Sequence, residues 1–321
     1  MSERVKILIP GDNPVQVAAS PHLNRLAPYG DITLYDTTPQ SSEEKLERAQ
    51  GHQIILNSRG VVTWRQAEFS ALPDLRMLTT CSIGTDMIDL SSAKDHGVVV
   101  SNQPGRTAPV VAEHMFGLMF AVAKRAAFMT SQIQAGQWPR RMNSMIQGKT
   151  LGIIGSGNIG AEMARLGNAI GMEVIAWTFN PSDERAAQLG VRFVELDELL
   201  RSADIISLHV ALTEDTRNLI STDQMAMMKQ GALVLNGARG PVVNMDALAA
   251  ALECGHLGGA ALDVFDTEPF AEDHPIKHCE NIILTPHAAD QTPEGVDLLN
   301  EGAVDNIIAF LEGRPQNNVA I

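Results

Sequence analysis

Four polar side chains in the second half of the sequence have the types and positions needed for acid–base chemistry. Arg239 follows the apolar run GALVLN, Asp263 lies within AALDVF, Glu268 comes five residues after Asp263, and His287 ends IILTPH. A histidine exchanges a proton near neutral pH, and an arginine binds a carboxylate through two parallel hydrogen bonds. Each residue alone also has an ordinary structural interpretation, namely a surface charge, a turn or a core histidine, so the pattern defines candidates for a site.

A glycine-rich turn lies upstream of these residues. The stretch LGIIGSGNIG, residues 151–160, breaks an apolar run with Gly155, Gly157 and Gly160. In a dinucleotide site the first glycine makes the turn, the second lets a pyrophosphate approach the backbone, and the third lets the following helix pack on the strand. Apolar residues at helical spacing follow, before a strand predicted at 173–177. The context predicts a nucleotide-binding βαβ unit, with a purely structural turn as the alternative.

The elements that must position these residues alternate between strand and helix. In the first third of the chain, strands are predicted at 5–10, 31–35, 53–57, 76–79 and 94–100. After the glycine-rich turn, strands are predicted at 173–177, 191–194, 204–210, 231–236, 259–265 and 281–287, with helices between them and a last helix at 294–312. The alternation predicts an α/β fold with parallel sheets covered by helices. Ligands in such folds bind beyond the carboxyl ends of strands, where the four polar side chains lie.

Two segments between these series indicate how the chain is organised. A Pro-Gly pair within residues 102–105 interrupts the pattern and predicts a domain boundary. Residues 109–125 form an almost uninterrupted apolar helix, expected to be buried between domains or subunits, and a loop is expected around 136–148.

Composition narrows the class of protein. With 321 residues, 45% of them hydrophobic, the chain is long enough for two domains, and no apolar run approaches the length of a membrane span. The first residues run directly into a strand pattern without a signal peptide, which predicts a cytoplasmic protein. Three cysteines without metal-ligand spacing predict neither a disulfide framework nor a metal site. A net charge of −14 disfavours nucleic acid and anionic membranes as partners.

Several motifs resemble those of the D-isomer-specific 2-hydroxyacid dehydrogenases. NGARG at 236–240, LDVFDTEP at 262–269 and TPHAA at 285–289 lie downstream of the glycine-rich turn, as in that family. CSIGTDMIDL at 81–90, NQPG at 102–105, VAEH at 111–114 and SLHVALTEDTRNLI at 207–220 match in the same order. The resemblance therefore covers nearly the whole chain.

The resemblance implies two Rossmann-like doubly wound parallel-sheet domains with an active-site cleft between them. Residues 1–101 and 291–321 would form a discontinuous substrate (catalytic) domain, and residues 102–290 the dinucleotide-binding domain. The activity implied is hydride transfer between NAD and a small 2-oxo acid or D-2-hydroxy acid. The expected partners are this small anionic substrate and a second copy of the chain, a homodimer built around the helix at 109–125.

Matching positions imply a role for each site residue. Arg239 would bind the substrate carboxylate and carbonyl, His287 would be the acid/base, and Glu268 would hold the imidazole. The backbone of Ser82, Ile83 and Gly84 would take the substrate carboxylate, and Asp263 would bond the nicotinamide amide. The residues expected to contact the dinucleotide are Gly155, Gly157, Asn158, Ile159, Gly160, Thr178, His209, Ala238 and Asp263.

Some positions depart from the family pattern. Thr178 stands where NAD-preferring folds place a carboxylate, but no arginine or lysine follows before Arg185, so NAD is favoured and NADP remains open. Asn57 replaces the arginine expected of members that act on phosphoglycerate. Trp138 either reaches the pocket of a partner subunit or simply packs at an interface. The alternative function is that of a nucleotide-sensing interaction protein of the corepressor type, which the presence of all three catalytic residues disfavours.

Overall fold

The structure is a computed structural model that describes residues 4–270 and 272–320, and the chain divides into two compact units. Unit 1 comprises the residues up to Thr107 together with those from Gln291 onward, and unit 2 comprises Ala108–Asp290. The sequence predicts the first crossing before Asn102, whereas the structure has it after Thr107. The reason is that the Asn102 and Gln103 amides still donate to the carbonyls of Asn317 and Ser82, at 3.3 and 3.0 Å.

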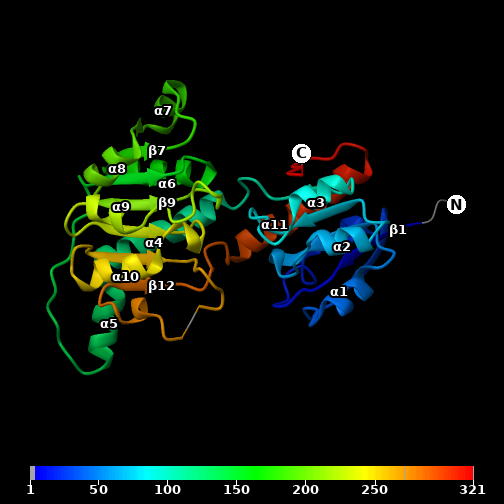
Figure 1. Ribbon diagram of the computed structural model, residues 1–321, viewed down its shortest axis with the longest axis horizontal. Coiled ribbons are helices and arrows are strands. Elements are labelled where there is room, and N and C mark those ends of the chain that lie inside the picture. The colour runs from blue at the N-terminus through cyan, green and yellow to red at the C-terminus, as the bar shows by residue number, and fades with distance from the viewer. Residues whose placement is uncertain (1–3, 271, 321) are drawn as a thin grey trace. The chain divides into compact units, whose positions relative to one another are not determined.

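The described strands of unit 1 form a wholly parallel sheet in the order β2-β1-β3-β4-β5 (Figure 1). They are β1 (Val5–Ile9), β2 (Gly30–Leu34), β3 (Ile54–Asn57), β4 (Met77–Thr80) and β5 (Val99–Ser101). The helices are η1 (Pro21–Leu26), α1 (Ser42–Ala49), η2 (Ser58–Gly60), α2 (Gln66–Ala71), α3 (Leu90–Asp95) and α11 (Pro293–Leu311). Neighbouring strand residues such as Ile7 and Leu8 belong to different apolar clusters, because a covered parallel sheet buries both faces.

One predicted strand of unit 1 is partly wrong. The sequence predicts a strand at 94–100, but Leu90–Asp95 is helix α3 and the strand is only Val99–Ser101. The Asp89 carboxylate starts this helix by accepting from the Ser92 amide at 3.0 Å. Gly97, with φ of 70°, then turns the chain into the strand.

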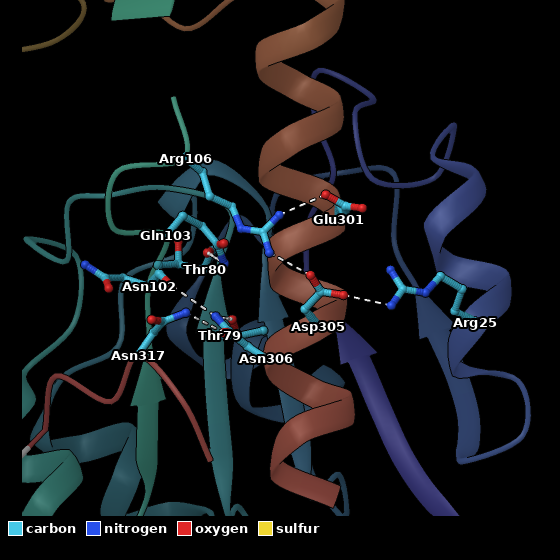
Figure 2. A network of polar contacts seen from close by, with 10 residues as sticks. All are labelled: Arg25, Thr79, Thr80, Asn102, Gln103, Arg106, Glu301, Asp305, Asn306 and Asn317. Carbon is cyan, nitrogen blue, oxygen red and sulfur yellow. Dashed lines mark hydrogen bonds and ion pairs between the residues drawn. The ribbon is translucent and has the colours of Figure 1, made fainter. Parts of the chain in front are cut away.

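Helix α11 packs on the sheet of unit 1, and a polar network ties it to the segment that leaves the unit (Figure 2). Arg106 pairs with Glu301 at 2.9 Å and with Asp305 at 2.6 Å. Asp305 also pairs with Arg25 at 2.7 Å, and the Asn306 amide donates to the carbonyl of Asn102 at 3.0 Å. This network fixes the returning segment to the unit that the chain left earlier.

In unit 2 the described strands form a second parallel sheet, ordered β12-β11-β10-β9-β6-β7-β8 (Figure 1). They are β6 (Thr150–Ile154), β7 (Glu173–Trp177), β8 (Arg192–Phe193), β9 (Ile205–Leu208), β10 (Leu233–Asn236), β11 (Gly259–Leu262) and β12 (Ile282–Leu284). The helices are α4 (Ala108–Ala123), α5 (Ala126–Gln134), α6 (Asn158–Ala169), α7 (Asp183–Leu189), α8 (Leu196–Ser202), α9 (Thr222–Met227), η3 (Gly240–Val242), α10 (Met245–Glu253) and η4 (Pro275–His278). The βαβ unit predicted at the glycine-rich turn is confirmed as β6, α6 and β7.

The apolar helix predicted at 109–125 is shorter than expected and is followed by a second helix. Helix α4 ends at Ala123, because Arg125 adopts a left-handed conformation with φ of 51°, and α5 follows without any buried residue. Met115 and Met119 of α4 are fully buried in the apolar core of unit 2 itself. The helix is therefore largely a core element of its own unit.

Among the described residues, no helix is both long and apolar enough to cross a membrane. The described part of the chain also contains no group of three or more histidine, cysteine, aspartate or glutamate side chains that could hold a metal ion. Cys81, Cys254 and Cys279 are free thiols.

Candidate active site

The hydrogen-bond ladder of the unit 2 sheet continues beyond its strands and aligns the loops that carry the polar residues. The Asp263 amide donates to the carbonyl of Asn236 at 3.0 Å, and the His287 amide donates to the carbonyl of Asp263 at 2.8 Å. These bonds join the carboxyl ends of β10, β11 and β12 into one row. Arg239, Asp263 and His287 therefore all follow adjacent strands at one edge of the sheet, as the sequence predicts.

The structure brings Glu268 and His287 into direct contact. The Nδ1 atom of His287 lies 2.8 Å from Glu268 Oε2, and both side chains are about two-fifths exposed, at 43% and 38%. Partial burial alone raises the pKa of Glu268, but the hydrogen bond and charge of His287, the Phe265 amide and the charge of Arg239 outweigh it and lower that pKa. Glu268 is thus ionised at neutral pH, so Nδ1 carries the proton in this bond. Nε2, the ring nitrogen remote from the carboxylate, is the atom placed for proton exchange.

A buried carboxylate shapes the turn that presents His287. Asp263 is 1% exposed, and its oxygens accept from the Thr285 hydroxyl at 2.5 Å and from the amides of Ala288 and Ala289 at 2.9 and 3.0 Å. Burial alone raises the pKa of Asp263, but these hydrogen bonds and one from His114 hold that pKa below its usual value. The carboxylate thereby stabilises a backbone in which His287 has φ of 51°, an uncommon conformation for a non-glycine residue.

The loop of Arg239 is held against the loop that leads to Glu268. The side chain of Asn236 is fully buried and bonds twice to this loop, donating to the carbonyl of Arg239 at 3.0 Å and accepting from the Ala238 amide at 3.1 Å. A Cβ atom at Gly240 would lie 2.0 Å from the carbonyl carbon of Phe265, so only glycine allows this approach. Arg239 Nη1 donates to the carbonyl of Ala238 at 2.8 Å. Gly240 and Asn236 of the NGARG motif therefore fix the backbone on either side of Arg239.

The glycine-rich turn has the geometry that a dinucleotide requires. Gly155 has φ of 96°, and a Cβ there would lie 2.7 Å from the carbonyl oxygen of His209. A Cβ at Gly160 would lie 2.1 Å from the carbonyl oxygen of Gly155, whereas one at Gly157 would meet nothing within 4 Å. The first and third glycines are thus required by the fold, while the second leaves open space beside the backbone. Asn158 and Ile159 begin α6, where the first N–H groups of a helix lack intrahelical acceptors, so the turn fits a pyrophosphate.

The remaining residues predicted to contact the dinucleotide lie around this turn or along the same edge of the sheet. Thr178 directly follows β7, and Ala238 is buried after β10. The Nε2 atom of His209 lies 2.8 Å from the Ser207 hydroxyl, and burial lowers the pKa of His209 to about 3. His209 is therefore neutral at physiological pH.

The predicted carboxylate-binding segment belongs to unit 1. Ser82, Ile83 and Gly84 follow β4 and are partly exposed. The Ser82 hydroxyl donates to the carbonyl of Gly84 at 2.7 Å, and the Asn102 side chain donates to the carbonyl of Ile83 at 2.7 Å. These bonds define the loop within its own unit.

Two side chains that support the site have no role in the sequence-based prediction. His114 of α4 lies 3.5 Å from Asp263 through Nε2, and the same atom lies 3.2 Å from the Thr285 hydroxyl. Both residues stand inside motifs that match the family, VAEH and TPHAA. Their place in these motifs is the only sign in the sequence that they could belong to the site. Their contacts join residues 149 positions apart (His114 and Asp263) and 171 positions apart (His114 and Thr285), and only the fold brings such residues together.

A parallel α/β sheet that carries both a dinucleotide turn and a histidine bonded to a carboxylate is typical of a dinucleotide-dependent oxidoreductase. Comparison with known proteins agrees. The sequence model of the D-isomer specific 2-hydroxyacid dehydrogenase NAD binding domain matches residues 116–289. The chain belongs to this family, and it is an oxidoreductase of 2-hydroxy acids that uses a nicotinamide dinucleotide.

Individual relatives extend the similarity over most of the chain. A glyoxylate reductase of Korarchaeum cryptofilum is 34% identical, over 92% of this chain and 91% of that protein. A glycerate dehydrogenase of Methylorubrum extorquens is 36% identical, over 89% of this chain and 90% of that one. The crystal structure of a glyoxylate reductase from Paecilomyes thermophila superposes with a TM-score of 0.90 at 27% identity, covering 99% of both chains. These similarities support the enzyme over the nucleotide-sensing alternative.

Proposed function

We propose that the enzyme reduces small 2-oxo acids to D-2-hydroxy acids, with Arg239, Glu268 and His287 as its catalytic residues. The observation that carries this proposal is the 2.8 Å contact of Glu268 with His287 Nδ1, because it orients Nε2 as a proton donor. Arg239 binds the carboxylate of the substrate through its planar fork. The backbone of Ser82, Ile83 and Gly84 is proposed to bind the same carboxylate, and unit 1 to form the substrate domain.

The chemistry follows from these placements. The nicotinamide, when bound, supplies the hydride that reduces the carbonyl carbon of the 2-oxo acid. Negative charge then develops on the carbonyl oxygen, and His287 neutralises it by transferring the Nε2 proton. Glu268 stays ionised and stabilises the imidazolium before the transfer. Arg239 holds the carboxylate of the substrate so that the carbonyl oxygen of the substrate faces His287 Nε2. This orientation lowers the barrier in addition to the proton transfer itself.

The residues predicted to contact the cofactor are proposed to hold it as follows. Gly155, Gly157 and Gly160, with the first amides of α6 at Asn158 and Ile159, bind the pyrophosphate. Thr178 lies at the ribose, and His209, Ala238 and Asp263 line the path to the nicotinamide. Because protein donors occupy both carboxylate oxygens of Asp263, we assign this residue mainly to shaping the turn of His287.

The substrate class is that of short 2-oxo acids. Relatives named as glyoxylate reductases and a glycerate dehydrogenase favour glyoxylate and hydroxypyruvate. Asn57 is fully buried and bonds both to the carbonyl and to the amide of Val62, so its side chain shapes a loop. This use of Asn57 disfavours a phosphorylated substrate at that position.

The direct test is the loss of reduced-nicotinamide absorbance with glyoxylate, hydroxypyruvate, pyruvate and bulkier 2-oxo acids, each run with NADH and NADPH. We expect saturable turnover that depends on the side chain of the acid and is fastest with the short ones. Saturable binding of cofactor without turnover of any acid would contradict the proposal and favour the sensing function.

We further propose that the enzyme is a homodimer that acts in the cytoplasm. The segment after α4 exposes large apolar side chains, namely Ile133 at 53%, Trp138 at 78%, Met142 at 91% and Met145 at 64%. An apolar surface of this kind is typical of a protein interface, and Trp138 would pack there or reach the pocket of the partner subunit. Free Cys81, Cys254 and Cys279 suit a reducing compartment. Light scattering of the wild type and of Trp138→Ser tests the dimer, which the variant should weaken.

A further inference from the structure

The end of β7 lacks the carboxylate that selects NAD in folds of this kind. The amide of Gly155 donates to the carbonyl of Trp177 at 2.9 Å, so the end of this strand lies directly beside the glycine-rich turn. Thr178 is the next residue, and it is followed by Phe179 and Asn180. In NAD-selective sites an acidic residue here binds the ribose 2′-hydroxyl and repels a 2′-phosphate. This chain places no negative charge at that position.

An arginine from the next helix reaches the turn instead. Arg185 of α7 donates through Nη2 to the carbonyl of Ser156 at 2.6 Å and to the Ser156 hydroxyl at 3.1 Å. Ser156 stands between Gly155 and Gly157, within the proposed pyrophosphate site, and is 3% exposed. The guanidinium is therefore anchored on the glycine-rich turn next to the end of β7.

The described residues offer no acceptor to the other nitrogens of this guanidinium. Both side-chain bonds of Arg185 are made by Nη2, and within the described part of the chain no carboxylate forms an ion pair with it. Asp183 and Glu184 are close in sequence, but both are exposed and neither pairs with Arg185. In a chain of net charge −14, an anchored arginine that pairs with no carboxylate of the described residues fits an anionic ligand.

We propose that Arg185 binds the 2′-phosphate of NADP(H), so that this enzyme binds NADPH more tightly than NADH. The inference rests on the proposed function, because it takes the dinucleotide to lie on the glycine-rich turn. Anchoring by Ser156 pre-orders the guanidinium, which reduces the entropy lost when the phosphate binds. Thr178 contributes by its small, uncharged side chain, which leaves the 2′-phosphate unopposed.

The test is to titrate the full chain with NADPH and, separately, with NADH in the absence of any 2-oxo acid. Isothermal titration calorimetry measures the two dissociation constants. We expect NADPH to bind about 10- to 100-fold more tightly, the range expected for charge-assisted hydrogen bonds to a phosphate. Arg185→Gln should bring the ratio of the dissociation constant of NADH to that of NADPH close to one. Thr178→Asp, which keeps Arg185, should lower the same ratio by repelling the phosphate and provides a second variant should the first fold poorly.

Arg201→Gln is the matched control, because it removes the same charge from an exposed position on α8 of the same unit. It should keep the wild-type ratio. Equal affinities in the wild type, or a preference for NADPH that survives Arg185→Gln, would overturn the inference while leaving the proposed function intact. A chain that binds neither dinucleotide would overturn the proposed function, and the inference with it.

Discussion

Each unit contains a charged cluster beside its sheet, and the two clusters are built differently. In unit 1, Arg106 pairs with Glu301 and Asp305, and none of these three residues has a positive φ. In unit 2, His287, whose Nδ1 lies 2.8 Å from Glu268, has φ of 51°. A non-glycine residue in that region costs about 1 to 3 kcal/mol unless its surroundings enforce it, and such residues are concentrated at functional sites.

The comparison shows that ion pairs alone do not identify a site. The Arg106 cluster joins a helix to a loop and is explained by the fold. The His287 pair depends on Asp263, a buried carboxylate whose contacts impose one backbone conformation on the turn. Backbone conformation alone does not identify the site either, because Arg125 also has φ of 51° and pairs with Glu280 at 3.1 Å. The proposed catalytic centre is distinguished by the combination of the His287 pair with the buried carboxylate that shapes its turn. Changing each cluster separately tests this distinction.

The largest effect is expected from His287→Ala. Loss of the proton donor should lower kcat by roughly 10²- to 10⁴-fold, the usual contribution of general acid catalysis. The dissociation constant of the cofactor should change little, because the dinucleotide turn is built from other residues. Steady-state kinetics and a cofactor titration measure both. His278→Ala, which removes an exposed histidine of the same unit, should retain turnover, and equal activity of the two variants would remove the acid/base assignment.

Asp263→Asn should have a smaller effect, mainly on stability. The NH2 group of the asparagine side chain would face hydrogen-bond donors that now bond to the Asp263 carboxylate. We therefore expect the free energy of unfolding at pH 7 to fall by about 1 to 3 kcal/mol. Because folding lowers the pKa of Asp263, its stabilisation is complete above the unfolded value of about 3.9 and is lost as pH falls through the folded value.

Urea unfolding at several pH values checks this prediction. The difference between the wild type and Asp263→Asn should be widest near neutral pH and should narrow below about pH 4. Asp223→Asn, at an exposed position of α9, should shift the free energy of unfolding by no more than about 0.5 kcal/mol. A difference that grows in acid would show that Asp263 does not act as a carboxylate in the folded chain.

Arg106→Gln should have the smallest effect. Its partners are partly exposed, so loss of both ion pairs should lower the free energy of unfolding by about 1 kcal/mol, and less at high salt. Turnover should stay within about twofold, since no residue of this cluster has a proposed role in the chemistry. Denaturation curves at low and high salt, together with kcat, test this. A large loss of turnover at unchanged stability would break the distinction between the two clusters.

The sequence predicts much of this architecture because its signals are local. The glycine-rich turn, the alternation of strand and helix, and the strands that carry Arg239, Asp263 and His287 depend on short-range patterns, and the structure confirms these elements. The strand expected at 94–100 is partly wrong, because the helix that Asp89 caps extends to Asp95 and the strand begins only at Val99. Helix α5 was not predicted, since it depends on a left-handed residue, Arg125, that has no distinctive signal.

Contacts between distant residues could not be predicted in the same way. The sequence shows Asp263 and Arg185, but it cannot show that one bonds to His114 and the amides after His287, or that the other reaches Ser156 across 29 positions. Such contacts depend on strand order and helix packing. The sequence therefore predicts which residues follow the strands, and the structure adds how their conformations are enforced.

The most direct test of the central claim is the configuration of the product formed from hydroxypyruvate. Reduction with limiting NADPH or NADH is followed by chiral chromatography of the glycerate, with the loss of reduced cofactor measured in the same sample. We expect D-glycerate in a one-to-one ratio with the cofactor consumed. Formation of L-glycerate, or a sustained absence of product with cofactor bound, would contradict it.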